Sequence, residues 1–334
     1  MNDTVRVGVI GSGRVGQIGH LGPLSQMREV RLAALAELRP ELGKRVLERY
    51  GVERLYRTHR ELLDDREVDA VVVVTRREHT AGVVLDALRA RKHVLSEKPM
   101  AQTLEEAHQL VEAAASAGTV YAIGYMKRSD DVVHDLHGRL ASAAWTESYG
   151  ILRETRVRMC CGDDTGKNEA DWIMTEEARP GEADRRDSEL GTFLNVYSHA
   201  TNVTRYLVNE PYVPVDVERA AEMRVRARAA SGSRIDFVLA DRRDSAWDES
   251  VTLVFERATV RVDFPAPFQQ DGRVRAVIEN EDRTEKLVSS VWAHARQAQR
   301  FVDAIRGGEA MPCSGADALL DVAFATELMQ VPAQ

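Results

Sequence analysis

The first residues that could do chemistry form a glycine-rich run near the N-terminus, Gly11-Ser12-Gly13-Arg14-Val15-Gly16. The run directly follows an apolar stretch and precedes a helical pattern, which is the setting in which G-x-G-x-x-G binds a dinucleotide. The first glycine permits a tight turn, the second lets the backbone approach a pyrophosphate, and the third lets the helix pack closely on the strand. The sequence therefore predicts a dinucleotide site at this run.

An acidic residue, Glu37, ends the next apolar stretch, about 20 residues after Gly16. At this distance a carboxylate can accept hydrogen bonds from the adenosine ribose hydroxyls, which favours NAD. Arg14 and Arg39 favour NADP instead, because a guanidinium can bind a 2'-phosphate. NAD is our prediction, and NADP stays open as the alternative.

A lysine lies at the end of a later apolar stretch, in the run Glu97-Lys98-Pro99. Ligands of open α/β sheets bind beyond the carboxyl ends of the strands, so we expect Lys98 to point at the cofactor crevice. A solvated loop lysine is the alternative, because most lysines are exposed.

The elements that must position these residues alternate between strand and helix. Near-continuous apolarity, typical of strands buried on both faces, marks Val5–Ile10, Val30–Ala36, Val68–Thr75, Lys92–Glu97 and Val120–Gly124. Helical spacing lies between them, as in Thr80–Arg91 and Leu104–Ala117, and Thr103 with Glu106 forms a capping box before the latter. This order predicts a doubly wound parallel Rossmann sheet over residues 1–125.

After about residue 126, apolar and polar residues alternate with a period of two, which is typical of antiparallel strands with one solvated face. The ranges concerned are Leu152–Met159, Glu222–Arg228, Arg234–Leu239, Ser250–Phe255, Thr259–Phe264 and Arg273–Ile278. Helices are predicted at Gly191–Leu207, Val291–Ile305 and Ala316–Leu328, and Gly162–Ser188 is predicted to be an irregular loop over a site. We therefore predict an α/β chain whose second domain, 126–334, is α+β with a large open, mainly antiparallel sheet of six strands. The C-terminal helices could pack back on the first domain.

Four features together resemble the Gfo/Idh/MocA family of oxidoreductases: GSGRVG, Glu37, the run HVLSEKPM and the following GYMKR. The resemblance covers essentially the whole chain and implies the same two-domain architecture. It also implies that Lys98 lies beside the nicotinamide and the reacting carbon. In relatives the bond that corresponds to Lys98-Pro99 is often cis, so a cis peptide is expected here. A homodimer or homotetramer, formed through the exposed sheet face, is implied as well.

The family carries a second catalytic helix, which corresponds here to Gly191–Asn202. Spacings of i, i+4 and i+7 place Asn195, His199 and Asn202 on one helix face. His199 is the candidate general base, because a group that removes a hydroxyl proton should titrate near neutral pH. Relatives carry carboxylates where this chain has Asn195 and Asn202, and an amide cannot take a proton. Asn195 is therefore assigned to orienting the substrate, and proton transfer to His199, Lys98 or, ranked third, Tyr197, which faces another direction.

The resemblance implies further contacts near the ends of the third and fifth strands. Relatives carry Thr-Pro followed by a His that helps hold the cofactor, whereas this chain has Thr75-Arg76 and a His79 one position early. Arg76 and His79 are therefore equally well explained as solvated residues. The full predicted cofactor set is Gly11, Ser12, Gly13, Arg14, Val15, Gly16, Glu37, Thr75, Arg76, His79, Glu97, Lys98 and Tyr125, and the predicted substrate set is Lys98, Tyr125, Lys127, Asn195, His199 and Asn202.

Composition narrows the class of partner. The 334 residues carry a net charge of -8 without a basic stripe, which argues against nucleic acid as a partner. No apolar run is long enough for a membrane span and no signal peptide is apparent, so the cytoplasm is the expected location. The cysteines, Cys160, Cys161 and Cys313, have no metal-ligand spacing, and no metal is predicted.

These features predict an enzyme that transfers a hydride between NAD(P) and a secondary alcohol or ketone of a sugar, aminosugar, cyclitol or sugar nucleotide. Two alternatives stay open: a redox-neutral epimerase, eliminase or glycosidase that retains its NAD, and a non-catalytic sensor. A cationic substrate such as an aminosugar or aminocyclitol is suggested by the net acidity and by the acid-rich loop that holds Asp163, Asp164, Glu169, Asp171, Glu176 and Glu177, although a merely solvated loop is the better explanation of that loop.

Overall fold

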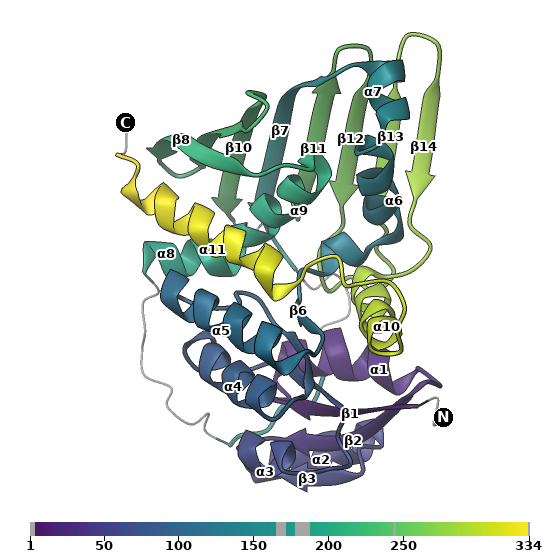
Figure 1. The fold of residues 1–334 in the computed structure, drawn as a ribbon, viewed down its shortest axis with the longest axis vertical. Coiled ribbons are helices and arrows are strands. Elements are labelled where there is room, and N and C mark those ends of the chain that lie inside the picture. Colours follow the sequence, from purple (N-terminus) through teal and green to yellow (C-terminus); the bar gives the residue numbers. More distant parts are fainter. Residues whose placement is uncertain (1–3, 165–171, 178–187, 243–244, 333–334) are drawn as a thin grey trace. The chain divides into compact units, whose positions relative to one another are not determined.

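The structure, a computed structural model, describes residues 4–164, 172–177, 188–242 and 245–332. The chain divides into two compact units (Figure 1). The first draws on Met1–Met126, Glu169–Ser188 and His294–Val322, and the second on Lys127–Asn168, Glu189–Ala293 and Ala323–Gln334. Each unit therefore combines segments that lie far apart in the sequence.

The first unit is built on a parallel sheet of six strands in the order β3-β2-β1-β4-β5-β6. The strands are β1 (Val5–Ile10), β2 (Val30–Ala36), β3 (Arg54–Tyr56), β4 (Ala70–Val73), β5 (His93–Ser96) and β6 (Tyr121–Ile123). This order reverses at β1 and β4, which confirms the predicted doubly wound sheet. The sequence patterns missed β3, because its three residues do not form an apolar run.

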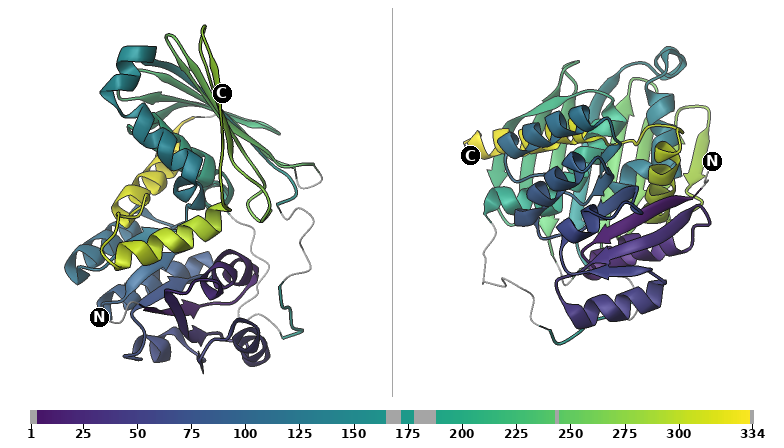
Figure 2. Two further views of the ribbon diagram at one scale, coloured as in Figure 1. Left: turned by 90° about the vertical axis from the view of Figure 1, so that its right-hand side faces the viewer. Right: turned by 60° about the horizontal axis from the view of Figure 1, so that its bottom comes forward.

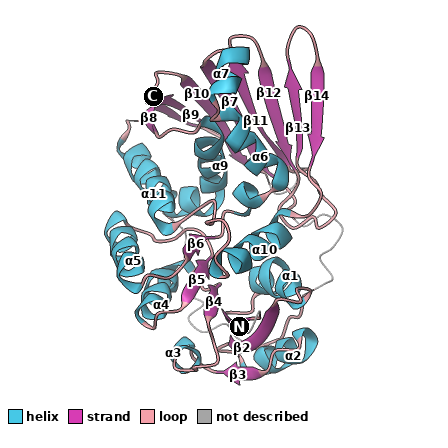
Figure 3. Ribbon diagram, turned by 45° about the vertical axis from the view of Figure 1, so that its right-hand side comes forward, coloured by secondary structure: helices cyan, strands magenta, loops and turns pink. Residues whose placement is uncertain are grey.

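Helices accompany this sheet on both faces (Figure 3). They are η1 (Gly16–Leu21), α1 (Gly22–Ser25), α2 (Pro40–Tyr50), α3 (His59–Leu63), α4 (Arg77–Arg89), α5 (Leu104–Ala117) and α10 (Ala293–Ile305), with α11 (Gly315–Gln330) following. The predicted range of α5 and its capping box, in which the Thr103 side chain accepts from the Glu106 N–H, are confirmed. The start of α2 was not predicted, although Pro40 occupies a favoured first-turn position.

The apolar core on one face of this sheet is completed by the far end of the chain. Val7, Val9 and Leu35 from the strands are fully buried there together with Phe301 and Val302 of α10. The helix that follows the antiparallel sheet in sequence thus belongs to the core of the first unit.

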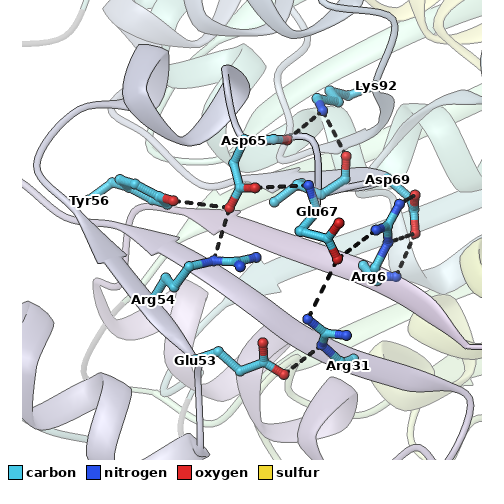
Figure 4. A network of polar contacts seen from close by, with 10 residues as sticks. Arg6, Arg31, Glu53, Arg54, Tyr56, Asp65, Glu67, Asp69 and Lys92 are labelled. Carbon is cyan, nitrogen blue, oxygen red and sulfur yellow. Dashed lines mark hydrogen bonds and ion pairs between the residues drawn. The ribbon is translucent and has the colours of Figure 1, made fainter.

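The amino ends of the parallel strands carry a network of ion pairs (Figure 4). Arg6 donates to Asp69 at 2.6 Å and lies 2.9 Å from Glu67, and Arg54 lies 3.0 Å from Asp65. The Lys92 ammonium donates to the carbonyls of Asp65 and Val68 at 2.9 and 2.7 Å. These interactions connect the amino ends of neighbouring strands. They lie at the opposite end of the sheet from the carboxyl ends of the strands.

The second unit contains a sheet of eight strands in the order β14-β13-β12-β11-β7-β10-β9-β8. The strands are β7 (Leu152–Cys161), β8 (Tyr212–Arg219), β9 (Met223–Ala229), β10 (Arg234–Asp241), β11 (Asp248–Phe255), β12 (Thr259–Phe264), β13 (Arg275–Glu279) and β14 (Thr284–Val288). All neighbours pair antiparallel except β7 and β10, which are parallel. The predicted open, mainly antiparallel sheet is confirmed.

The prediction of six strands was wrong, because both edge strands were missed. β8 contains Pro214, a residue that a sheet tolerates only where no ladder hydrogen bond is needed from its nitrogen. β14 has no fully buried residue, so its sequence lacks the apolar alternation of the inner strands. Edge strands carry a weaker pattern because they bury less surface.

The helices of this unit gather on one face of the sheet (Figure 2). They are η2 (Met126–Ser129), α6 (Asp131–Leu140), α7 (Ala143–Tyr149), α8 (Glu189–Thr192), η4 (Phe193–Tyr197) and α9 (Ser198–Val208). The strands bury alternate residues, as Val225 and Ala227 do in β9, while Arg224, Arg226 and Arg228 are exposed. Within the described chain, no helix is both long and apolar enough to cross a membrane.

Candidate functional site

The predicted cofactor residues of the first unit follow the carboxyl ends of its parallel strands. The glycine-rich run comes after β1, Glu37 after β2, Thr75 after β4 and Lys98 after β5. Because the strands are parallel, these positions lie together at the carboxyl ends of the strands, where open α/β sheets bind their ligands.

Two of the three glycines are required by the fold, because a side chain at either position would clash with the protein's own backbone. Gly11 has φ +94°, and a Cβ on it would lie 2.2 Å from the Val74 carbonyl oxygen. A Cβ on Gly16 would lie 2.5 Å from the Gly11 carbonyl oxygen. A Cβ on Gly13, in contrast, would meet nothing within 4 Å. Open space above a bare backbone is what a phosphate needs for close approach, so this loop fits a dinucleotide.

We expect Gly11→Ala to destabilise the first unit, because a left-handed backbone disfavours a side chain by about 1–2 kcal/mol before the clash with Val74 is counted. Gly13→Ala is the matched control. It should leave the free energy of unfolding nearly unchanged and weaken dinucleotide binding. Thermal unfolding with and without NAD measures both effects, and equal destabilisation by the two substitutions would contradict this view of the loop.

Glu37 is buried and already bonded within the loop. One carboxylate oxygen accepts from the Ser12 N–H at 3.0 Å and the Ser12 hydroxyl at 2.8 Å, and the other accepts from Arg39 Nε at 2.9 Å. Burial alone would raise the pKa of Glu37, but the bonds from Arg39 and Ser12 outweigh it and hold this pKa below its ordinary value. Glu37 is thus an ionised carboxylate fixed beside the glycine-rich run.

This lowered pKa predicts a pH-dependent stability. The folded chain binds its Glu37 proton less readily than the unfolded chain, so the stabilisation is present above the ordinary pKa of 4.5 and is lost as the pH falls through the folded value. We expect Glu37→Gln to lower the free energy of unfolding by about 1–3 kcal/mol at neutral pH, with the difference from the wild type shrinking on acidification. Urea unfolding at several pH values measures it, with the exposed Glu48→Gln as control. A difference that stays constant with pH would contradict the assignment.

The residue before Lys98 is held by a histidine that the sequence patterns did not single out. His20, 1% exposed in η1, places Nε2 2.8 Å from a Glu97 carboxylate oxygen. The other Glu97 oxygen accepts from the Lys98 backbone N–H at 3.2 Å. Burial alone would raise the pKa of Glu97, yet His20 holds it below its ordinary value. Lys98 therefore follows a fixed carboxylate whose side chain is 14% exposed.

Lys98 itself is half-buried, and the Lys98-Pro99 peptide is cis, as the family resemblance implied. Tyr125, after β6, is buried with 3% exposure. No sequence signal pointed to His20, because it lies 77 residues from Glu97 and within a π-helical turn.

Thr75, Arg76 and His79 lie at the start of α4. The Thr75 hydroxyl is 3.1 Å from that of Thr80, and Arg76 is the N-cap residue of the helix. His79 is exposed in its first turn. The surface position of His79 is compatible with either a cofactor contact or a solvated residue, so its predicted role stays a prediction.

Lys127 belongs to the second unit and is buried in an ion pair. Its ammonium lies 2.5 and 2.6 Å from the two Glu249 carboxylate oxygens, and the side chains are 5% and 1% exposed. The Trp247 indole N–H donates to Glu249 at 3.1 Å, and Lys127 Nζ lies 5.5 Å from the centre of the Phe264 ring. The charge that was predicted to bind substrate is thus engaged by a carboxylate of the same unit.

The predicted second catalytic helix is a continuous helical run, but it contains a π-helical turn, η4, that the spacing argument did not foresee. Asn195 and His199 are half-buried, whereas Asn202 is 1% exposed and its carbonyl accepts from Arg128 at 2.8 Å. Burial raises the pKa of Tyr197 to about 12, so its phenol keeps its proton at neutral pH. Of the predicted site residues in this helical run, Asn195 and His199 are therefore the ones exposed enough to contact a ligand.

Some predicted features lie partly outside the described residues. Glu169 and Asp171 of the acid-rich loop are among them, as is most of the predicted loop from 162 to 188. Within the described ranges, no group of three or more His, Cys, Asp or Glu side chains could hold a metal ion, and all three cysteines are buried.

Comparison with known proteins places residues 5–125 in the family described as "Oxidoreductase family, NAD-binding Rossmann fold" (GFO_IDH_MocA). A myo-inositol 2-dehydrogenase from Thermotoga maritima is 26% identical over 62% of this chain, which spans 55% of that relative. An inositol 2-dehydrogenase from Burkholderia lata is 25% identical over 91% of this chain and 86% of its own. A 3-ketoreductase from Actinomadura kijaniata, solved in complex with NADP, has the same fold, with a TM-score of 0.75, 19% identity and coverage of 99% and 98% of the two chains.

Proposed function

Residues 5–125 of this chain belong to the Gfo/Idh/MocA family of oxidoreductases, and on that premise we propose that the chain oxidises or reduces a secondary alcohol or ketone of a sugar, aminosugar, cyclitol or sugar nucleotide. One observation carries the proposal. At the carboxyl ends of the parallel strands of the first unit, the glycine-rich loop, which leaves space for a phosphate, follows β1, and Lys98 follows β5. The names of the inositol dehydrogenase relatives support a polyhydroxylated ring as the substrate.

A bound nicotinamide would supply or accept the hydride in such a reaction. The residues proposed to hold the dinucleotide are those of the glycine-rich run, with Glu37 beside the adenosine ribose and Thr75, Arg76, His79, Glu97, Lys98 and Tyr125 along the remaining strand ends. We propose residues 1–125 as the dinucleotide-binding domain and residues 126–334 as the domain for substrate and oligomerisation, except that helix α10 of the latter range packs in the core of the first unit.

In the proposed mechanism, Lys98 acts on the reacting oxygen. Its ammonium donates a hydrogen bond that stabilises negative charge as the hydroxyl becomes an alkoxide, or polarises the carbonyl in the reverse direction. Glu97 limits the freedom of this lysine, because its carboxylate is held by His20 and accepts from the Lys98 backbone. A fixed backbone reduces the entropy that must be lost when the oxygen is engaged.

His199 is the proposed proton acceptor, because an imidazole titrates near neutral pH. Asn195 is proposed to orient a substrate hydroxyl, since its amide can donate and accept a hydrogen bond but cannot store a proton. With its pKa raised to about 12, the Tyr197 phenol stays protonated at neutral pH and is not available to accept a proton, which is consistent with its third rank. Tyr125, Lys127 and Asn202 complete the proposed substrate set, although each is at most 4% exposed in the structure. We propose a cytoplasmic homodimer or homotetramer.

The test is an assay of the purified chain with NAD+ or NADP+ and a panel of cyclitols, sugars and aminosugars. A stoichiometric rise in reduced nicotinamide absorbance supports the proposal, and product formed without any such change would favour a redox-neutral reaction instead. Thermal unfolding with each dinucleotide separates binding from turnover, because a ligand that binds the folded chain stabilises it by an amount that grows with the ligand concentration relative to Kd. A chain that binds no dinucleotide would overturn the proposal.

A further inference from the structure

A short segment from the middle of the sequence, residues 172–177, lies against the elements that flank the glycine-rich run. Gln17, in the helical turn after this run, exchanges two hydrogen bonds with the Ile173 backbone at 2.8 and 3.0 Å. The amide of Gln17 also donates to the Ser12 carbonyl at 2.8 Å. The segment is therefore anchored within the first unit, next to the proposed dinucleotide loop.

The other end of this segment places Glu177 at the start of α2. Its two carboxylate oxygens accept from the backbone N–H groups of Glu41 and Leu42 at 3.0 and 2.9 Å, and one also accepts from the Thr175 hydroxyl at 3.2 Å. The bonds from Glu41 and Leu42, aided by the positive charge of Arg39, lower the pKa of Glu177 below its ordinary value. An ionised carboxylate thus occupies the donors that this helix start would offer to an anion.

Arg39, one of the two arginines that could favour a phosphorylated ribose, lies at the start of the same helix. Arg39, the N-cap residue of α2, donates from Nε and Nη2 to the two oxygens of Glu37 at 2.9 and 3.2 Å. Glu37 is the carboxylate proposed to receive the ribose hydroxyls, so a 2'-phosphate would arrive beside Arg39 and the start of α2. Both of these anion-binding groups are already engaged by carboxylates, Arg39 by Glu37 and the helix start by Glu177.

We propose that Glu177 is a specificity-determining residue that makes the chain prefer NAD to NADP. It fills the helix-start donors that a 2'-phosphate would use, and it adds a second negative charge to that of Glu37 against the phosphate. Rejection by a like charge and by occupied donors is a common basis of specificity. This inference rests on the proposed dinucleotide-dependent function, and it adds Glu177 of the segment 172–177 to the preference for NAD that Glu37 already favours.

The test measures dissociation constants of NADH and NADPH for the full chain by calorimetry, so that no substrate is needed. Glu177→Gln removes the charge with little change in shape and should strengthen NADPH binding by about five- to tenfold, while NADH binding changes by less than about twofold. The gain should shrink at high salt, because it is electrostatic. Arg39→Met in the same chain should abolish the gain, since the guanidinium would be the phosphate's partner.

Two controls separate charge from structure. Glu176→Gln removes the same charge from the exposed neighbouring residue and should leave the NADPH to NADH ratio unchanged. Glu177→Asp keeps the charge and should keep the preference for NADH even if α2 is loosened, which thermal unfolding would reveal. A wild type that prefers NADPH, or a Glu177→Gln variant in which both affinities move together or neither moves, would overturn the inference. A wild type that binds neither dinucleotide would overturn the proposed function itself.

Discussion

Replacing Lys98 with methionine should lower kcat by about 10²- to 10³-fold while the dinucleotide still binds. Methionine keeps the length and the apolar stem of the side chain but cannot donate a hydrogen bond to a developing alkoxide. The fixed position of Glu97 should persist, because the Lys98 backbone N–H that it accepts from is unchanged. Steady-state kinetics together with calorimetry of NAD binding separate the two effects.

Lys92→Met is the matched control for this prediction. Lys92 lies in the same unit but at the amino ends of the strands, where its ammonium holds the carbonyls of Asp65 and Val68. Its loss should lower the free energy of unfolding by about 1–3 kcal/mol, because two part-buried carbonyl acceptors lose a charged donor, and should leave kcat nearly unchanged. An active Lys98→Met enzyme would show that this lysine has no part in the chemistry.

Replacing Glu249 with glutamine should destabilise the second unit by about 3–5 kcal/mol. The substitution leaves the Lys127 ammonium buried without its carboxylate, in an environment lined by Trp247 and Phe264. Urea unfolding at neutral pH measures the loss. The double variant Lys127→Met with Glu249→Leu should recover most of it, since a buried ion pair replaced by apolar groups is often neutral or stabilising.

An exposed pair in the same sheet provides the comparison. Arg158 and Asp248 form an ion pair with side chains 44% and 50% exposed, so breaking it by Asp248→Asn should cost about 0–1 kcal/mol. The result also bears on the predicted substrate role of Lys127. If Lys127→Met mainly raised KM and barely changed the free energy of unfolding, the lysine would be a substrate ligand and not a structural partner of Glu249.

The fold could largely be predicted because burial leaves a periodic trace in the sequence. Strands β1 and β2 are buried on both faces and were predicted with their observed bounds, and β12 was found from its period of two. The elements that were missed bury little or are short. β3 has three residues, and β8 and β14 are edge strands. Their sequences do not need the apolar pattern on which the prediction depended.

The site was predictable only where a local motif carries its chemistry. The glycine-rich run and Lys98 are each adjacent to a strand, so their positions follow from the sheet alone. The partners of the motifs come from distant parts of the chain. His20 meets Glu97 across 77 residues and Glu177 meets Glu41 across 136. Separations of this length follow from no helical or strand periodicity, so only the folded structure shows that these residues are in contact.

The participation of α10 in the core of the first unit has a consequence for the synthesis of this protein. Residues 1–126 leave the ribosome well before Phe301 and Val302, which fill one face of the parallel sheet. During that interval the apolar surface that α10 covers has no permanent cover, and the whole antiparallel sheet must be translated before it arrives. The nascent dinucleotide domain therefore matures late, and an expressed fragment that ends at residue 126 should be prone to aggregation rather than stably folded.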